Sequence, residues 1–397
     1  MGKIIDKISS LSKEKRKDFF EKLKDHIRQE GKGNRGFSLE REVKCEKNSL
    51  EQPDDIVKGD NFCCNISTPG MLGSIKFRKI DLLPPEPNQV QIEARAIGIN
   101  FRDLMIGLGL YPSNPDIPFF MGSDYSGIVT DVGEETSEFK PGDEVIALSG
   151  TSPFIQEEEI ISKGHFSSSI NVFPDQVVYK PKNINFYEAA TIPTVFLTSY
   201  YALYFLAQLK KDEKILIHSA TGGVGLAAIQ MAQEIGAEIF STAGSVEKRD
   251  YLKSLGIIKI MNSRTLSFSE EIMEMTRGQG VDVVLNLLSG QAIQHGLNVL
   301  REFGRFIHID KKDIYGNSSL ELKMFKKGIT FSILELSLFL KQSATLKKLL
   351  KELIVFFEAG TFQPLPYQLF PIWEVGNVLT QMSHAKHIGK FVLDLRA

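Results

Sequence analysis

The sequence predicts an α/β protein that combines a doubly wound parallel sheet with a second, mostly β domain. The parallel sheet is indicated by residues 214–242, where two apolar runs flank a glycine-rich turn and an Ala-rich helical pattern. Helical patterns then alternate with short apolar runs up to residue 335, which is typical of right-handed β-α-β crossovers. Between residues 61 and 149, alternating apolar stretches separated by Pro- and Gly-containing turns indicate the β domain.

Length and composition narrow the class of protein. With 397 residues, 42% of them hydrophobic and 24% charged, the chain can form more than one core and resembles soluble globular proteins. A formal net charge of −2 gives no reason to expect a nucleic acid partner. Cys45, Cys63 and Cys64 fit a reducing compartment and are too few for a zinc lobe with four thiolates. Without a signal-like apolar core or a run of about eighteen apolar residues, the protein is predicted to be cytoplasmic and to have no membrane partner.

Residues 1–60 are predicted to be an appended segment. Apolar positions at helical spacing among Lys, Arg and Glu predict a helix over residues 1–30, followed by a polar linker. Such a narrow apolar stripe fits docking on a neighbouring protein and folding back on its own domain equally well.

The β domain is predicted to comprise residues 61–185 and 336–397. Strand patterns begin at Asn61, and residues 150–169 interrupt them as a surface excursion or as a flap over the site. The final part shows an amphipathic helix over residues 338–360, a short helix over 375–382, and the apolar run GKFVLDL. This ending is expected to return to the β domain and add a strand to it.

Residues 186–335 are predicted to form the parallel-sheet domain, and their glycine-rich turn indicates a dinucleotide. Gly222 and Gly223 allow backbone to approach a pyrophosphate, Val224 follows in the first helical turn, and Gly225 allows the helix to pack on the strand. The first position of the motif is Ala220 rather than Gly. The alternative is a purely structural turn of an α/β protein.

The residues after the second predicted strand indicate which dinucleotide binds. An acidic residue there would bind an adenosine ribose, but the chain has hydroxyl residues up to Ser245, with Lys248 and Arg249 just beyond. Cations and hydroxyls would hold a 2′-phosphate, so the sequence favours NADPH over NADH. Alternatively, both cations lie on a solvated helix face.

Seven motifs follow one another from about Phe62 to the C-terminus. They are INFRDLMIGLGLYP (99–112), GSDYSGIVTDVG (122–133), FKPGDEV (139–145), AATIPTVFLTSYYAL (189–203), ILIHSATGGVGLAAIQMA (215–232), GVDVVLNLLSG (280–290) and HIGKFVLDL (387–395). In this order they resemble the zinc-free medium-chain dehydrogenases/reductases. Within that family, which includes quinone oxidoreductase-like proteins, the chain is most similar to enoyl reductase domains of modular polyketide synthases and animal-type fatty acid synthases. The resemblance implies a GroES-like catalytic domain with an inserted Rossmann domain, NADPH, and an enoyl thioester on acyl carrier protein.

The resemblance implies Tyr111 and Lys311 as candidates for the proton supplied at Cα or for stabilising the developing oxyanion. This chain has Asp310 where the family usually has Gly before the lysine. Glu335 stands where the family often has Asp, and we expect it to pair with Lys311, since a carboxylate among apolar residues needs a partner. The structural alternatives are an aromatic at a turn and a loop lysine.

The remaining candidates concern the cofactor. By resemblance Asn100 lies near the nicotinamide, Thr198 and Lys390 reach the cofactor cleft, and Asn286 with Leu287 occupies the crevice at the end of a strand. No metal ligands are expected, because His384 and His387 lack further ligands and are expected on a surface turn. His218, inside a strand pattern, is expected to be a core residue rather than a base.

These candidates are compatible with four functions. The first is NADPH-dependent reduction of an enoyl group on acyl carrier protein. A variant closes a cyclopropane by displacing a γ-halide. The chain also fits a quinone or enone reductase and, in a different class, a non-catalytic NADPH-binding protein. Partners are expected to be carrier protein and, through the N-terminal helix, other synthase domains, with the chain a monomer or a homodimer.

Overall fold

A computed structural model describes residues 56, 59–66, 68, 70–111, 121–149, 166–336 and 343–396. The chain divides into a unit of Met1–Lys44 and a unit of Cys45–Ala397, and all that follows concerns the second unit. The predicted N-terminal helix, nearly all of the linker, and most of the 150–169 excursion lie outside the described residues.

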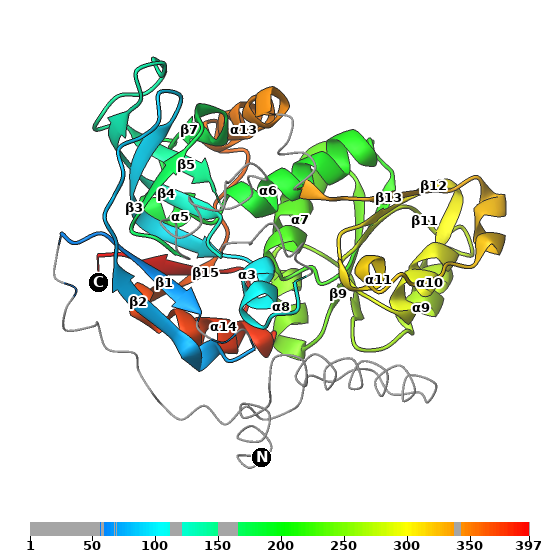
Figure 1. Ribbon diagram of the computed structural model, residues 1–397. Helices are drawn as coiled ribbons and strands as arrows, with labels where there is room; N and C mark the ends of the chain where they lie inside the picture. The colour runs from blue at the N-terminus through cyan, green and yellow to red at the C-terminus, as the bar shows by residue number, and fades with distance from the viewer. Residues whose placement is uncertain are drawn as a thin grey trace, which may run out of the picture. The chain divides into compact units, whose positions relative to one another are not determined.

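The first sheet forms a β-rich lobe (Figure 1). Its strand order is β14-β15-β3-β4-β5-β7, with β6 paired to β3, and β1 and β2 form a separate antiparallel pair. All its pairings are antiparallel except β14 with β15. The strands are β1 (Phe62–Ile66), β2 (Ile75–Lys79), β3 (Val90–Ile99), β4 (Asp124–Val132), β5 (Glu144–Leu148), β6 (Ser169–Val172), β7 (Val177–Tyr179), β14 (Tyr367–Pro371) and β15 (Lys390–Asp394).

The second sheet is entirely parallel and forms the parallel-sheet lobe. Its order is β10-β9-β8-β11-β12-β13, so the direction of winding reverses between β8 and β11. In open α/β sheets such a reversal creates the crevice where ligands bind. The strands are β8 (Lys214–Ile217), β9 (Glu238–Ala243), β10 (Lys259–Asn262), β11 (Val281–Asn286), β12 (Leu300–His308) and β13 (Thr330–Ile333).

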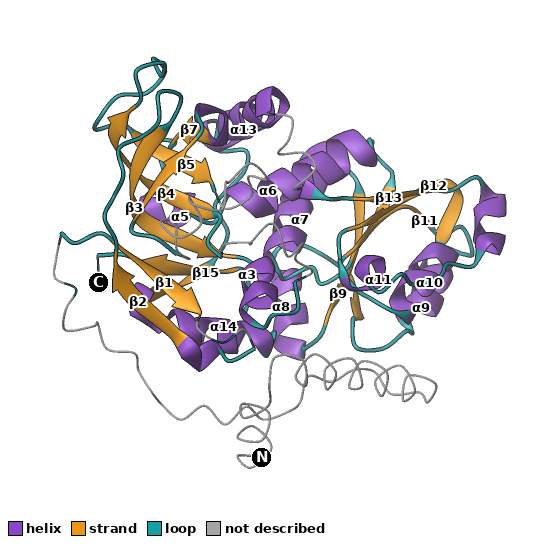
Figure 2. Ribbon diagram, in the orientation of Figure 1, coloured by secondary structure: helices purple, strands orange, loops and turns teal. Residues whose placement is uncertain are grey.

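Helices cover both faces of the parallel sheet, as Figure 2 shows. Ile215 and Ile217 of β8 join a core with α6, α7 and α8, whereas Leu216 faces α9 and α10. Apolar side chains on both faces explain why these strands are continuous apolar runs rather than alternating patterns. The helices are α6 (Pro193–Tyr200), α7 (Gly223–Ile235), α8 (Val246–Ser254), α9 (Phe268–Met275) and α10 (Gln291–Asn298).

The remaining helices are short or lie at the lobe boundaries. Pro193 interrupts the predicted helical stretch at the first position of α6, where its missing N–H costs nothing. The segments are α3 (Phe101–Gly107), α5 (Phe186–Ala189), α11 (Lys312–Tyr315), α13 (Ser343–Glu358), α14 (Val375–Ser383), the π-helical turn η3 (Tyr201–Leu206) and the 3₁₀ turns η1 (Leu72–Ser74), η2 (Pro174–Gln176), η4 (Leu322–Lys327) and η5 (Ile372–Glu374).

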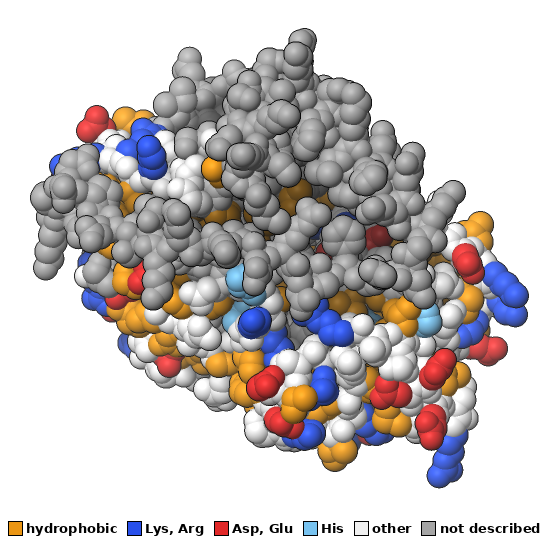
Figure 3. Space-filling view, turned by 90° about the horizontal axis from the view of Figure 1, so that it is seen from below, with side chains coloured by type: hydrophobic (Ala, Val, Ile, Leu, Met, Phe, Trp, Pro, Cys, Tyr) orange, Lys and Arg blue, Asp and Glu red, His pale blue; other side chains and the backbone are white. Residues whose placement is uncertain are grey.

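The C-terminal part returns to the β-rich lobe as predicted. β15 pairs with β3, so that Phe391 lies opposite Ile99, and α14 packs against α3 and η1. The predicted fold class, a mostly β domain with an inserted doubly wound sheet, is therefore confirmed. Within the described part of the chain, no helix combines the length and apolar character that crossing a bilayer requires. Figure 3 shows one face, where described Lys and Arg side chains lie among Asp and Glu.

Candidate active site

Most of the candidate residues lie at one edge of the parallel sheet. The glycine turn follows β8, Ser245 follows β9, Leu287 follows β11, Lys311 follows β12, and Glu335 follows β13. Because these strands are parallel, their carboxyl ends share one edge. The strand order thus gathers segments that are more than a hundred residues apart in the sequence.

The glycine turn has the geometry of an anion-binding helix start. Gly222 is the N-cap of α7, and the N–H groups of the first turn that follows have no acceptor within the helix. A Cβ on Gly222 would meet only the carbonyl oxygen of Ser219, at 3.4 Å, which leaves space beside the backbone. A Cβ on Gly225 would lie 2.6 Å from Ala220 Cα, so only glycine allows this approach of helix and strand. The turn therefore fits a pyrophosphate.

The space beside Gly223 is filled by other segments of the chain. A Cβ on Gly223 would lie 2.8 Å from Val195 Cγ1 and 3.2 Å from Lys390 Cδ. Its side of the turn is thus occupied by α6 and β15 rather than open to a ligand. Val224 is held by Ser199, whose hydroxyl donates to the Val224 carbonyl oxygen over 2.9 Å.

Cations surround the segment after β9. Ser245 caps α8 by accepting from the Lys248 N–H, and Arg249 donates through Nη1 to the Ala243 carbonyl oxygen over 3.3 Å. A Cβ on Gly244 would lie 2.8 Å from Arg264 Nε, so a third cation lies against this turn. Burial, and next the charge of Arg264, lowers the pKa of Lys248. The Lys248 ammonium donates to the Ala385 carbonyl oxygen of the β-rich lobe over 2.8 Å.

Lys311 and Glu335 form an ion pair between the segments that follow β12 and β13. The Lys311 ammonium also lies 3.5 Å from the Leu334 carbonyl oxygen, and both side chains of the pair are partly buried. Glu335 lies two positions beyond β13 rather than within a strand. The backbone at Asp310 has no positive φ, so glycine is not needed there, and its carboxylate accepts from the Lys312 N–H over 3.1 Å.

Tyr111 approaches the same pair from the β-rich lobe. The Arg102 guanidinium lies 5.5 Å from the centre of its ring. Burial raises the pKa of the Tyr111 phenol, Arg102 opposes this shift, and Glu335 and Tyr315 raise the pKa further. The Tyr111 phenol therefore lies within electrostatic reach of Glu335, the partner of Lys311, and Tyr315 is a second phenol within that reach.

Asn100 follows the last residue of β3 and is held in place by hydrogen bonds. Its N–H donates to Asp103 Oδ2 over 2.7 Å, and the other oxygen of that carboxylate accepts from the Gly122 N–H over 2.9 Å. The Asn100 side chain is buried, and its carbonyl oxygen accepts from the Lys390 ammonium over 2.6 Å. Burial raises the pKa of Asp103 to about 6, against the effect of its backbone partners.

Three further candidates are buried or partly buried around the crevice. Thr198 is buried on α6, the helix that packs on α7. Asn286, the last residue of β11, donates to the Leu288 carbonyl oxygen over 2.6 Å and lies 2.8 Å from Nδ1 of His308. Leu287 packs against the large core of the parallel-sheet lobe.

The histidines divide into different environments. His218 is buried with Nδ1 3.0 Å from Thr242 Oγ1, and burial lowers its pKa to about 3, as a core residue requires. His384 is exposed, but the expectation of a surface turn is wrong for His387. His387 lies 4.5 Å from the Phe391 ring, and burial, Lys248 and Lys390 lower its pKa to about 4. Among the described residues, no cluster of at least three His, Cys, Asp or Glu side chains could hold a metal ion.

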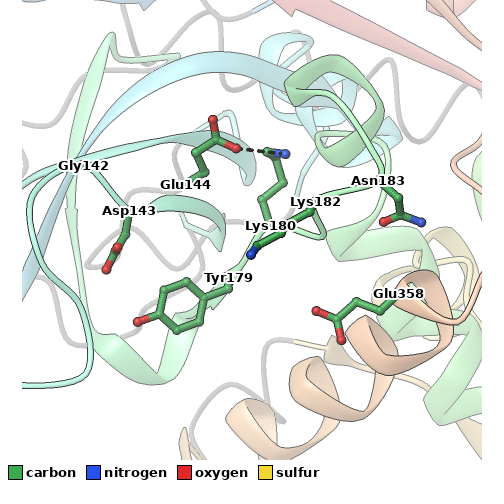
Figure 4. Close-up of a pocket in the computed structure, with 8 residues that line it drawn as sticks. All are labelled: Gly142, Asp143, Glu144, Tyr179, Lys180, Lys182, Asn183 and Glu358. Carbon is green, nitrogen blue, oxygen red and sulfur yellow. Dashed lines mark ion pairs between the residues drawn. The ribbon is translucent and has the colours of Figure 1, made fainter.

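A surface pocket of about 640 Å³ lies outside this constellation (Figure 4). It is lined by residues near β5, β7 and α13, and Lys180 points toward Glu144, with which it forms an ion pair of 3.1 Å. None of its lining residues is a candidate site residue. The candidate site therefore lies at the carboxyl ends of the parallel strands and not in this pocket.

Sequence reasoning missed Arg264, Asp124 and Tyr315. Asp124 is fully buried at the start of β4 and pairs with Lys390, and an acid beginning an apolar strand was the available signal. Arg264 follows β10 and Tyr315 ends a short helix, and nothing in the local pattern distinguishes them from surface residues. Only the tertiary arrangement brings these two side chains to the site.

Two family models match the chain. Residues 86–182 match the alcohol dehydrogenase GroES-like domain, and residues 223–353 match the zinc-binding dehydrogenase family. A phenolphthiocerol/phthiocerol polyketide synthase protein of Mycobacterium tuberculosis is 36% identical over 331 residues. That match covers 83% of this chain but only 14% of the synthase protein.

Solved structures match over nearly their whole length. The CurK enoyl reductase is 38% identical with a TM-score of 0.75, covering 84% of this chain and 99% of that one. The CurF ER cyclopropanase from the curacin A biosynthetic pathway is 31% identical with a TM-score of 0.76 and the same coverage. The quinone oxidoreductase of Escherichia coli, crystallised with NADPH, is 25% identical with a TM-score of 0.72, covering 84% and 99%. This fold accommodates a nicotinamide cofactor.

Proposed function

This chain belongs to the enoyl reductases of the medium-chain dehydrogenase/reductase family, and we propose that it uses NADPH to reduce an α,β-unsaturated thioester carried on acyl carrier protein. The observation that supports the proposal is the Lys311–Glu335 ion pair after the parallel strands β12 and β13, with Glu335 close enough to raise the pKa of Tyr111. The bounds 61–185 with 336–397 and 186–335 remain our proposed limits of the catalytic and nucleotide-binding domains.

The residues around the glycine turn fit NADPH. The Gly222 N–H donates to the Ser219 carbonyl oxygen, and the N–H groups of Gly223 and Val224, in the first turn of α7, are the ones offered to the pyrophosphate. Ser245, Lys248 and Arg249, supported by Arg264, offer a hydroxyl and cations to a 2′-phosphate. We assign Thr198, Asn286 and Leu287 to the walls of the crevice nearer the nicotinamide. Lys390 and Asn100 complete the cofactor side of the site.

When bound, the reduced nicotinamide supplies a hydride to Cβ of the unsaturated thioester. The chain must then stabilise negative charge on the thioester oxygen and supply a proton at Cα. Lys311 provides a positive charge whose position is fixed by Glu335. We assign the proton added at Cα to the Tyr111 phenol, the proton-bearing group whose pKa is raised by burial and by Glu335.

The proposal is tested by offering crotonyl and γ-chlorocrotonyl groups on carrier protein with NADPH and weighing the products by mass spectrometry. A gain of two hydrogens on the crotonyl group supports enoyl reduction. Rapid NADPH oxidation by simple quinones, without any turnover of carrier-bound substrates, would instead identify a quinone reductase. Tight NADPH binding with no turnover of any acceptor would identify a non-catalytic binding protein.

A cyclopropane-forming variant is the second candidate, and the likeness to the CurF ER cyclopropanase favours it. Both outcomes share hydride addition at Cβ, after which a carbanion at Cα either takes a proton or displaces chloride at Cγ. Asp310, which precedes Lys311 where the family usually has Gly, is bonded to the Lys312 N–H, and we propose it as the difference from reducing relatives. Loss of chloride without gain of the second hydrogen would distinguish ring closure from reduction in the same mass experiment.

A further inference from the structure

Lys390 is the first residue of β15, is buried, and has specific partners. Its ammonium donates to Asn100 Oδ1 over 2.6 Å and to Asp124 Oδ2 over 3.0 Å, and its side chain is only 3% exposed. Asp124 is fully buried as well. Burying both charges is costly unless each is paired and hydrogen-bonded, as they are here.

Asp124 also connects the β-rich lobe to the start of α6. Its Oδ1 accepts from both the N–H and the hydroxyl of Thr194, in the first turn of that helix. The Thr194 hydroxyl is in turn 3.4 Å from the Asn100 side-chain nitrogen. One buried network therefore joins the end of β3, the start of β4, β15 and α6.

The same segment is bonded directly to the glycine turn. The Gly389 N–H donates to the Thr221 carbonyl oxygen over 2.9 Å, and Gly389 forms an isolated bridge with Gly222. Gly389 has φ +76°, and a Cβ there would lie 1.9 Å from the Pro366 carbonyl oxygen, so this contact requires glycine. The stem of Lys390 then passes the site of a Gly223 Cβ at 3.2 Å.

We propose that Lys390 and Asp124 are a positioning pair that clamps the glycine turn against Asn100 and so fixes how a cofactor bound on the turn faces the β-rich lobe. Two of the three N–H donors of the ammonium are bonded to Asn100 and Asp124, and the side chain is buried, so we assign Lys390 to positioning rather than to phosphate binding. The second half of the inference rests on the proposed NADPH site. The clamp itself belongs to the cofactor-free protein.

The clamp is tested first without cofactor, by hydrogen exchange and mass spectrometry of peptides covering residues 219–226. Lys390→Met and Asp124→Asn should each speed exchange of the turn amides by at least about tenfold, because a turn that opens locally exchanges faster. The exchange rate of the turn amides in the double variant should lie closer to the wild-type rate than that in either single variant. Removing both partners leaves no unpaired buried charge. Lys180→Met is the matched control, because Lys180 is also buried and ion-paired, with Glu144, but does not contact the turn.

Turnover provides a second readout. Lys390→Met should lower the turnover number by about tenfold or more and change the isotope effect with C4-deuterated NADPH, because hydride transfer is sensitive to small misplacement. The KM for NADPH should stay within about threefold, whereas loss of a phosphate ligand would raise it by about tenfold or more in a salt-dependent way. Unchanged turn exchange together with a large rise in KM would overturn the positioning role.

Variants that fail to fold are decisive as well. If the single variants do not fold, a folded double variant supports the pair, and a double variant that is equally unfolded overturns it. If Lys180→Met speeds exchange of the turn as much as Lys390→Met does, the effect is general destabilisation and the clamp is wrong. A wild-type protein that does not oxidise NADPH with any enoyl thioester refutes the proposed function, while the cofactor-free exchange cycle still decides the clamp.

Discussion

Replacing Asp103 by Asn should change how the stability of the protein depends on pH. The carboxylate is fully buried and accepts from two backbone N–H groups, those of Asn100 and Gly122. An amide has only one acceptor oxygen, so Asp103→Asn loses one of these bonds at every pH. The lost bond should cost about 1–3 kcal/mol of unfolding free energy.

The pH-dependent part comes from the raised pKa. Burial raises the pKa of Asp103 from 3.8 to about 6, so the folded chain binds more protons than the unfolded chain between these values. Stability from this group is therefore fully present below pH 3.8 and is lost as the pH rises through about 6. The difference between the two pKa values corresponds to about 3 kcal/mol of unfolding free energy. About 1.4 kcal/mol of this is lost between about pH 5 and about pH 7.5.

The assay is urea unfolding of wild type and Asp103→Asn at several pH values from about 5 to about 7.5. All other titrating groups are common to both proteins, so the difference in unfolding free energy isolates Asp103. We expect the variant to be less stable than wild type at about pH 5. The difference in unfolding free energy between the two proteins should be about 1.4 kcal/mol smaller at about pH 7.5. A gap that stays constant or widens with rising pH would refute the reasoning.

The remaining predictions concern catalysis, cofactor choice and packing. Tyr111→Phe should lower turnover by at least about tenfold at unchanged melting temperature, because it removes the proton donor; full activity in a steady-state assay would reject that role. Arg264→Gln should weaken NADPH binding by about tenfold in a fluorescence titration and leave NADH unaffected, since one charged hydrogen bond is lost; equal weakening of both cofactors would contradict a 2′-phosphate contact. Gly225→Ala should cost about 1–3 kcal/mol in denaturant unfolding, because its Cβ would lie 2.6 Å from Ala220 Cα. Gly73→Ala, whose Cβ would meet nothing within 4 Å, is the control and should be nearly neutral; similar losses in both variants would show that the contact at Gly225 is unimportant.

The fold could be predicted largely because its signals are local. The period of the apolar residues and the Gly and Pro residues between them predicted most strands of both sheets, although not β6 and β7, and the glycine turn predicted the end of the parallel sheet that carries the site. Tyr111 and Lys311 were implied by the family resemblance. Glu335 could be paired with Lys311 because it stands where the family often has Asp, and because a carboxylate among apolar residues needs a partner.

What could not be predicted depends on segments that meet only in the folded chain. Lys390 was expected at the cofactor, and its ammonium forms an ion pair with Asp124. No local sequence pattern indicates a pairing between residues so far apart in the chain. Arg264 lies in a turn whose side chains look solvated in sequence. His387 was expected on a surface turn because no further metal ligands are spaced with it, yet its ring lies 4.5 Å from the Phe391 ring.

The pairing of β15 with β3 also governs when the protein can fold during synthesis. Phe391 lies beside Ile99, so this sheet stays open until almost the entire described chain has left the ribosome. The parallel sheet uses only strands between Lys214 and Ile333 and can be complete earlier. Until β15 arrives, residues 96–99 of β3 lack their strand partner and can pair with other nascent chains.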